Sequence, residues 1–209
     1  MKFQTLKQNY IKGLLDTNAL LVKSINEEPF TMRNGKKSCM FMDHSKLATS
    51  AKAYRAFIDA IEFLLKETYE KNEFILCNVD SKISAQMVGS VAYNLEKSQI
   101  IYKSSALTAI EKGPHRQMTG NPAWDLPVAI LDDVSSGNDA TAKGVGDLAK
   151  ETFKKISDIQ IFVGYIREIK PTTYKMHYLL TRKELVTIVW DDLTHEQQAA
   201  IEKERKTWE

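Results

Sequence analysis

The sequence has few cysteines, few histidines and no long apolar run. Cys39 and Cys77 lie far apart without metal-ligand spacing, so we expect reduced, partly buried thiols. The four histidines do not cluster, which disfavours a transition-metal site. No apolar stretch approaches the ~20 residues of a membrane-spanning helix, and the first residues lack the apolar core of a signal peptide. We therefore expect a cytoplasmic protein with no membrane partner.

Neither sign of charge dominates the chain. With 29 basic and 27 acidic residues the net charge is +2, which gives no general attraction to nucleic acid, so any anion-binding site must be local. The hydrophobic share of 43% is enough for a full core, and the length of 209 residues favours one domain. We expect an N-terminal helix and hairpin over residues 1–45, an α/β core over 46–190 and a C-terminal helix over 191–209.

The hydrophobic periodicity predicts strands that alternate with helices. Apolar residues at helical spacing predict helices over residues 3–22, 46–70, 84–97, 140–155 and 194–208. Short apolar runs predict strands over residues 74–79, 100–102, 127–131, 159–165 and 174–180. This alternation favours a parallel, Rossmann-like sheet flanked by helices on both faces. Between residues 104 and 121 the periodicity fades, which predicts an exposed, mobile loop of a kind that is often functional.

The most informative segment follows the predicted strand at 127–131. Asp132 and Asp133 stand at its carboxyl end, a small-residue loop follows, and Asp139 can cap the next helix. The acids can hold ribose hydroxyls or a hydrated Mg²⁺, while backbone N–H groups and the helix dipole face a phosphate. An ordinary acidic turn is the alternative. We favour a sugar-phosphate site because open parallel sheets bind ligands outside the carboxyl ends of their strands.

A second informative segment is the hairpin over residues 30–43, called the hood below. An Asn-Gly turn separates two short predicted strands, and basic residues flank the turn. A binding role for Arg33 and a solvated position are about equally supported, whereas Lys36 and Lys37 fit a solvated hairpin tip. Phe41 follows in an aromatic and methionine-rich stretch.

Three segments resemble the type I phosphoribosyltransferases, and among them orotate phosphoribosyltransferase most closely. Asp132, Asp133, Ser135, Ser136 and Gly137 match the phosphoribosyl pyrophosphate motif of two acids and a hydroxyl- and glycine-rich loop. The segment Phe30-Thr-Met-Arg-Asn-Gly-Lys-Lys-Ser38, followed by Phe41, resembles the orotate enzyme's own hairpin. The segment Asn78-Val-Asp-Ser-Lys82 is similar to the family's pyrophosphate loop. The likeness covers most of the chain, and the first two segments are the distinctive ones.

The resemblance implies transfer of a phosphoribosyl group from phosphoribosyl pyrophosphate to a pyrimidine base, with orotate giving orotidine 5′-monophosphate and pyrophosphate. It places Asp132 and Asp133 at the ribose hydroxyls and residues 135–139, including Asn138 and Asp139, around the 5′-phosphate. It assigns Lys82 and Lys103 to the pyrophosphate, together with an Mg²⁺ ion that is held mainly by the substrate. Arg33, Phe41 and Arg167 would face the base. The family also implies a homodimer.

The chain departs from the family pattern in two loops. The loop after Asp133 is one residue short, and Asn138 and Asp139 stand where small or hydroxyl residues are typical. In the family's mobile loop, Lys103 matches, whereas an arginine and a second lysine do not. Two alternatives therefore stay open: a weakly active or inactive nucleotide-binding or regulatory protein of the same fold, and a phosphoribosyltransferase for another base.

Overall fold

The computed structural model describes residues 2–32, 35–70, 73–79, 81–97, 107–110, 117–119, 126–137, 140–152, 156 and 158–208. Its centre is a six-stranded sheet with the order β10-β9-β8-β5-β6-β7. Five strands run parallel: β5 (Ile75–Asn78), β6 (Leu107–Ile110), β8 (Val128–Ser135), β9 (Ile159–Ile166) and β10 (Lys175–Thr181). The edge strand β7 (Gln117–Thr119) is antiparallel to β6. The predicted parallel α/β sheet is confirmed.

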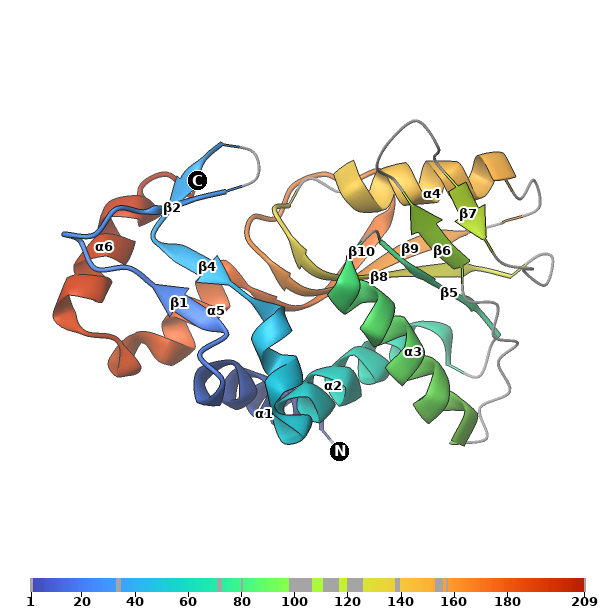
Figure 1. Cartoon of the computed structure of the whole chain (residues 1–209), viewed down its shortest axis with the longest axis horizontal. Helices are drawn as coiled ribbons and strands as arrows, with labels where there is room; N and C mark the ends of the chain where they lie inside the picture. The colour runs from blue at the N-terminus through green and yellow to red at the C-terminus, as the bar shows by residue number, and fades with distance from the viewer. Residues whose placement is uncertain are drawn as a thin grey trace.

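Helices cover both faces of the sheet (Figure 1). On one face lie α1 (Phe3–Asp16), α2 (Ala51–Tyr69) and α3 (Lys82–Lys97), and on the other lies α4 (Ala140–Thr152). The central strands carry continuous apolar runs because both of their faces are buried. Among the described helices, none is long and apolar enough to cross a membrane.

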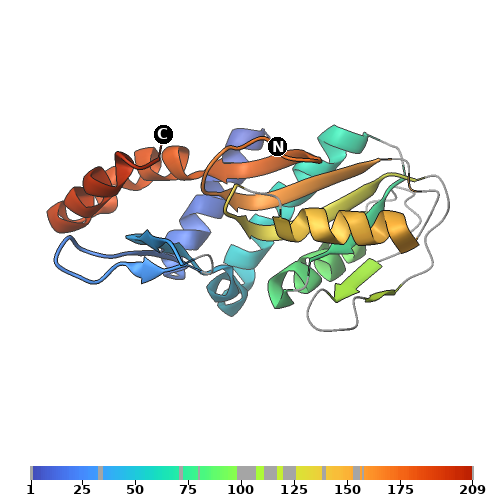
Figure 2. The ribbon, with the colours of Figure 1, turned by 90° about the horizontal axis from the view of Figure 1, so that it is seen from above.

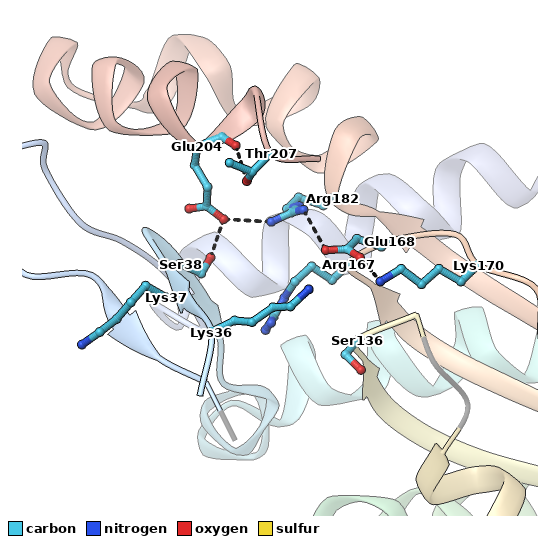
Figure 3. Close-up of a pocket in the computed structure, with 10 residues that line it drawn as sticks. All are labelled: Lys36, Lys37, Ser38, Ser136, Arg167, Glu168, Lys170, Arg182, Glu204 and Thr207. Atoms are coloured by element: carbon cyan, nitrogen blue, oxygen red, sulfur yellow. Dashed lines mark hydrogen bonds and ion pairs between the residues drawn. The ribbon is translucent and has the colours of Figure 1, made fainter. Parts of the chain in front are cut away.

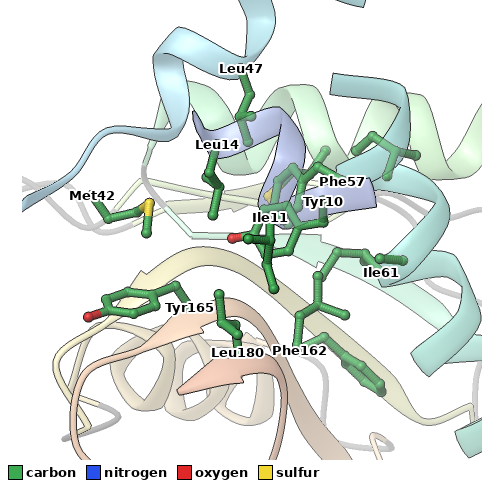
Figure 4. Close-up of a cluster of buried hydrophobic side chains, with 14 of the residues drawn as sticks. Tyr10, Ile11, Leu14, Met42, Leu47, Phe57, Ile61, Phe162, Tyr165 and Leu180 are labelled. Carbon is green, nitrogen blue, oxygen red and sulfur yellow. The ribbon is translucent and has the colours of Figure 1, made fainter. Parts of the chain in front are cut away.

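The larger core lies between α1, α2 and the sheet (Figure 4). Phe57, Ile61 and Leu65 recur at helical spacing along α2 and are fully buried against the sheet. Tyr10 and Leu14 of α1 are also fully buried, and the Tyr10 ring stacks against that of Phe57 (Figure 4). Helices α1 and α2 are therefore anchored to the sheet by this core.

The strand order reverses between β5 and β8. From β5 the chain passes to β6 on one side, and it then crosses to β8 on the other side before adding β9 and β10. The connections that leave the carboxyl ends of β5 and β8 thus diverge, which opens a crevice at that edge of a parallel sheet. The predicted phosphate-binding loop begins at the end of β8 with Ser135, and the predicted pyrophosphate loop begins at the end of β5 with Asn78. Both therefore lie at this edge of the sheet.

The hood and the C-terminal helices lie together at one end of the molecule (Figures 1 and 2). In the hood, β2 (Phe30–Thr31) pairs with β3 (Lys37–Ser38), and β4 (Met40–Met42) pairs with β1 (Leu20–Val22). The hood leads into the short helix η1 (His44–Thr49). The chain ends with α5 (Arg182–Val189), η2 (Trp190–Asp192) and α6 (His195–Arg205). The predicted hairpin is confirmed, and Thr194 and Gln197 form a capping box at the start of α6.

Several predicted boundaries are wrong. The first helix ends at Asp16, and residues 20–22 form β1 because they pair with the hood. The strand predicted over 127–131 runs on to Ser135, so the acidic pair lies inside β8, because β9 continues alongside it through Ile166. Helix α5 was not predicted as a separate element.

The stretch predicted as an unstructured loop, residues 104–121, contains two strands. Leu107–Ile110 pairs with β5, and Gln117–Thr119 pairs with β6. These short strands form through backbone pairing with a neighbouring strand, which local periodicity does not encode. The predicted strand at 100–102 lies outside the described residues.

Candidate functional site

The two acids of β8 face opposite sides of the sheet, because side chains alternate along a strand. Asp132 is buried, and one of its carboxylate oxygens accepts the Asp133 N–H at 2.9 Å. Burial, and then the neighbouring Asp133 charge, raise the pKa of Asp132 well above its usual value. The Asp133 side chain is 21% exposed, and its Oδ2 lies 3.7 Å from His44 Nδ1. Of the two acids, Asp133 is therefore the one with a solvent-accessible carboxylate.

The loop after β8 packs tightly against the segment that follows β9. The Gly137 N–H donates to Ser135 Oγ at 3.1 Å, and the Arg167 N–H donates to the Ser135 carbonyl at 2.9 Å. Gly137 has a φ of +99°, and a Cβ placed there would lie 2.0 Å from the Glu168 carbonyl oxygen. Only glycine fits this close approach, so the loop has a fixed backbone path next to Arg167.

The end of β5 is tied to β8 by one buried hydroxyl. Ser84 Oγ accepts the Val79 N–H at 2.9 Å and donates to the Leu131 carbonyl at 2.5 Å. The Ser81 hydroxyl accepts the Ser84 N–H at 3.0 Å near the start of α3. Lys82, the first residue of α3, is exposed at this edge. The structure thus places Lys82 at the same edge of the sheet as the acidic pair.

A cavity of about 420 Å³ lies beside the end of β8, between the hood, the segment after β9 and the C-terminal region (Figure 3). We call it the basic cavity, because five of its side chains are basic and two are acidic. Its lining residues are Lys36, Lys37, Ser38, Ser136, Arg167, Glu168, Lys170, Arg182, Glu204 and Thr207. The excess of positive charge favours an anionic ligand, and the volume suits a small one.

Buried ion pairs build one wall of the basic cavity. Arg182, with a side chain only 4% exposed, pairs with Glu204 at 2.9 Å and with Glu168 at 3.7 Å. Its guanidinium also lies over the Trp208 ring, 4.1 Å from the centroid. Burial opposes ionisation of Glu204, but hydrogen bonds from Cys39 and Ser38 and the charge of Arg182 hold its pKa below the usual value. The charges of this wall are therefore largely satisfied within it.

The predicted site residues are divided among several places. Ser136 and Arg167 line the basic cavity, and so does Lys36, which the sequence favoured as a solvated residue. Phe41 lies on the hood, 38% exposed, with its ring centroid 5.5 Å from that of Phe30, and it is not among the cavity-lining residues. The remaining predicted residues lie outside the described residues: Arg33, Lys103, Asn138 and Asp139.

Some residues at the site were not predicted. Tyr10, His44, Arg182 and Glu204 carried no local motif, and they meet the site from α1, η1, α5 and α6. No local spacing in the sequence indicates these four residues, because each comes from a different element.

The sequence matches no protein-family model and no curated protein. Among solved structures, the chain is similar to Leishmania donovani UMP synthase, with a TM-score of 0.70 and 14% identity over 95% of this chain. It spans only 42% of that longer protein. It is similar to Francisella tularensis orotate phosphoribosyltransferase with a TM-score of 0.67 and 14% identity, over 95% of this chain and 98% of that one.

A further similar structure is adenine phosphoribosyltransferase from Saccharomyces cerevisiae, with a TM-score of 0.55 and 13% identity, over 83% of this chain and 99% of that one. The fold is therefore that of the type I phosphoribosyltransferases, as the sequence resemblance implied. Orotate phosphoribosyltransferases are among the structures that share it.

Proposed function

We propose that this protein transfers a phosphoribosyl group from phosphoribosyl pyrophosphate to a base, and that the base is orotate. The observation that carries the proposal is the position of Asp133, whose partly exposed side chain lies near the carboxyl end of β8, at the strand-order reversal and three residues before Ser136 of the basic cavity. The similar solved structures named as phosphoribosyltransferases support the same class of reaction.

In this proposal, Asp132 and Asp133 contact the ribose hydroxyls, and the loop from Ser135 to Asp139 surrounds the 5′-phosphate. Such a transfer needs little covalent help from the protein, because the C1–pyrophosphate bond loosens into an oxocarbenium-like state. The site must hold the base in line and stabilise the charge of the leaving group. Lys82 and Lys103 would neutralise the pyrophosphate.

We also propose that Mg²⁺ accompanies the pyrophosphate, where it would supply charge neutralisation. Within the described part of the chain, no three metal-ligating side chains come together. In this proposal the ion is held mainly by substrate oxygens and water, which Mg²⁺ readily retains as ligands.

Orotate is favoured as the base because it carries a carboxylate. Arg167 and Lys36 contribute to the excess positive charge of the basic cavity, which would attract an acidic pyrimidine more strongly than adenine or uracil. Arg33 and Phe41 of the hood would complete the base-binding side. We further propose a homodimer, which light scattering at assay concentration would test.

The test is an absorbance assay of orotate consumption with phosphoribosyl pyrophosphate and Mg²⁺, run beside adenine and uracil. We expect turnover with orotate, and loss of turnover with an unchanged melting temperature in Asp133→Asn. Turnover with adenine or uracil alone would overturn orotate but keep the reaction class. If no base is consumed although phosphoribosyl pyrophosphate raises the melting temperature, the chain is a binding or regulatory protein instead.

A further inference from the structure

A buried tyrosine and a buried histidine lie directly behind Asp133. His44 Nδ1 is 3.7 Å from Asp133 Oδ2, and the Tyr10 hydroxyl is 2.6 Å from His44 Nε2. The three side chains come from α1, η1 and β8, so the fold brings them together from distant parts of the chain. The hydroxyl, the imidazole and the carboxylate form a continuous polar row inside an otherwise apolar core (Figure 4 shows Tyr10 in this core).

Aromatic packing fixes the two rings behind the carboxylate. The ring centroid of Phe57 lies 5.1 Å from that of Tyr10 and 5.0 Å from that of His44. The rings of Tyr10 and His44 are themselves stacked, with centroids 5.9 Å apart. Gly164 on β9 makes room for this cluster, because a Cβ there would lie 2.6 Å from Phe57 Cε2 and 2.9 Å from the Asp133 carbonyl oxygen.

Burial determines the protonation states in the row. Burial lowers the pKa of His44, against the opposing charges of Asp133 and Asp43, which favours the neutral imidazole at pH 7. Burial, and then the charge of Asp133 and the proximity of Tyr165, raise the pKa of Tyr10 well above its usual value, so its hydroxyl keeps its proton. A neutral imidazole carries one ring proton, which lies on either Nδ1 or Nε2.

The surroundings select one tautomer. A proton on Nδ1 points toward the Asp133 carboxylate, and Nε2 then accepts a hydrogen bond from the Tyr10 hydroxyl. The opposite tautomer would turn the Nδ1 lone pair toward a carboxylate. Within the described structure, Nδ1 is buried and has no hydrogen-bond partner, and Asp133 is the acceptor toward which it points.

We infer that Tyr10 and His44 are positioning residues for Asp133, an inference that rests on the proposed function. Tyr10 fixes the imidazole tautomer, and the Nδ1–H of His44 then orients Asp133 Oδ2 inward. The other carboxylate oxygen is thereby directed toward the open edge of the sheet, where the ribose hydroxyls of phosphoribosyl pyrophosphate would bind. An unpartnered buried N–H is costly, so ribose binding that draws the carboxylate closer to His44 would also satisfy this group.

The tautomer can be measured without any activity. In ¹⁵N-histidine-labelled protein, two-bond ¹H–¹⁵N correlation spectra distinguish a protonated Nδ1 from a protonated Nε2, and His44→Phe identifies the His44 signals. We expect a neutral ring with the proton on Nδ1, and a mixture of tautomers in Tyr10→Phe. A ring protonated on Nε2 in the wild-type protein would overturn the inference.

The positioning role is measured by calorimetric titration with phosphoribosyl pyrophosphate and Mg²⁺. Tyr10→Phe keeps the stacked ring and removes one hydroxyl, so we expect an affinity lower by about 2- to 10-fold, the range of one hydrogen bond. His44→Phe should lower the affinity at least as much. The matched control is Tyr69→Phe, because the Tyr69 hydroxyl is also buried but has no hydrogen-bond partner among the described residues.

The outcomes separate this inference from the proposed function. Folded wild-type protein that binds no phosphoribosyl pyrophosphate would overturn the proposed function. Wild-type binding with equal affinity in Tyr10→Phe and Tyr69→Phe would overturn the positioning role alone. Melting temperatures of all variants show whether a loss of affinity reflects unfolding.

Discussion

At the scale of single residues, the adjacent acids of β8 have different environments. Asp132 is buried on one side of the strand, whereas Asp133 on the other side keeps part of its carboxylate in solvent. Their order in the sequence is typical of a ribose-binding pair, but it does not reveal which of them is buried. That difference depends on which segments pack against each face of β8, and this is a property of the fold.

The raised pKa of Asp132 predicts a pH dependence of stability. The folded state keeps a proton that the unfolded chain releases above about pH 4, so the free energy of unfolding falls as the pH rises from there toward the folded-state pKa. Asp132→Asn should remove this slope and be more stable than the wild type at pH 7, by about 1.4 kcal/mol for each unit of pKa shift. Urea unfolding between pH 4 and 8 measures the effect.

Asp191→Asn is the control for that measurement, because it removes an exposed carboxylate on η2. Its pH slope should match that of the wild type. An unchanged slope in Asp132→Asn would show that burial of Asp132 does not govern the stability profile.

Gly137 allows a second prediction at this scale. Gly137→Ala combines a positive φ with a clash against the Glu168 backbone, so we expect a loss of about 1–3 kcal/mol of stability and weakened binding of phosphoribosyl pyrophosphate. Gly35→Ala is the matched control, since Gly35 has a φ of +77° but nothing within 4 Å of its Cβ position. It should lose only about 1 kcal/mol, from backbone strain, and bind normally. Equal losses in the two variants would argue against the close packing of the loop.

At the scale of the elements, one carboxylate joins three parts of the chain. Glu204 of α6 accepts hydrogen bonds from Ser38 Oγ of the hood at 2.9 Å and from Arg182 of α5 at 2.9 Å (Figure 3). It also accepts the Cys39 N–H of the hood at 2.5 Å. The hood is short and its strands have two or three residues each, so it depends on such contacts for its position. The C-terminal helix thus holds the hood over the basic cavity.

Glu204→Gln should therefore loosen the hood. The variant leaves the buried Arg182 beside a neutral partner, and we expect a loss of about 2 kcal/mol in the free energy of unfolding. We also expect faster hydrogen exchange in residues 37–42. Glu202→Gln on the same helix is the control, because its pair with Arg205 is exposed and contributes less than ~0.5 kcal/mol. Equal stability of the two variants would contradict a joining role for Glu204.

At the scale of the whole molecule, much of the architecture could be predicted from the sequence. The central strands carry unbroken apolar runs, and α2 has a clear helical period, because these elements are buried in ways that local composition records. The short strands β1, β6 and β7 could not be predicted, because they have only three or four residues each and form by pairing with another strand, which no local hydrophobic pattern records.

The candidate site was predictable only in part for the same reason. The acidic pair and the small-residue loop that follows it are contiguous in the sequence, so these residues could be found from their order alone. The wall of Arg182 and Glu204 and the row of Tyr10 and His44 are assembled from distant elements, and they carry no spacing that reveals them. Contacts between distant elements bring these residues together in the folded chain.

The central claim is that this edge binds phosphoribosyl pyrophosphate. The most direct measurement is calorimetric titration of the folded wild-type protein with phosphoribosyl pyrophosphate in the presence of Mg²⁺, beside Asp133→Asn. The account predicts saturable binding of one ligand per chain, and loss of that binding in Asp133→Asn at an unchanged melting temperature. Folded wild-type protein that binds no phosphoribosyl pyrophosphate, or an Asp133→Asn variant that binds as tightly as the wild type, would contradict it.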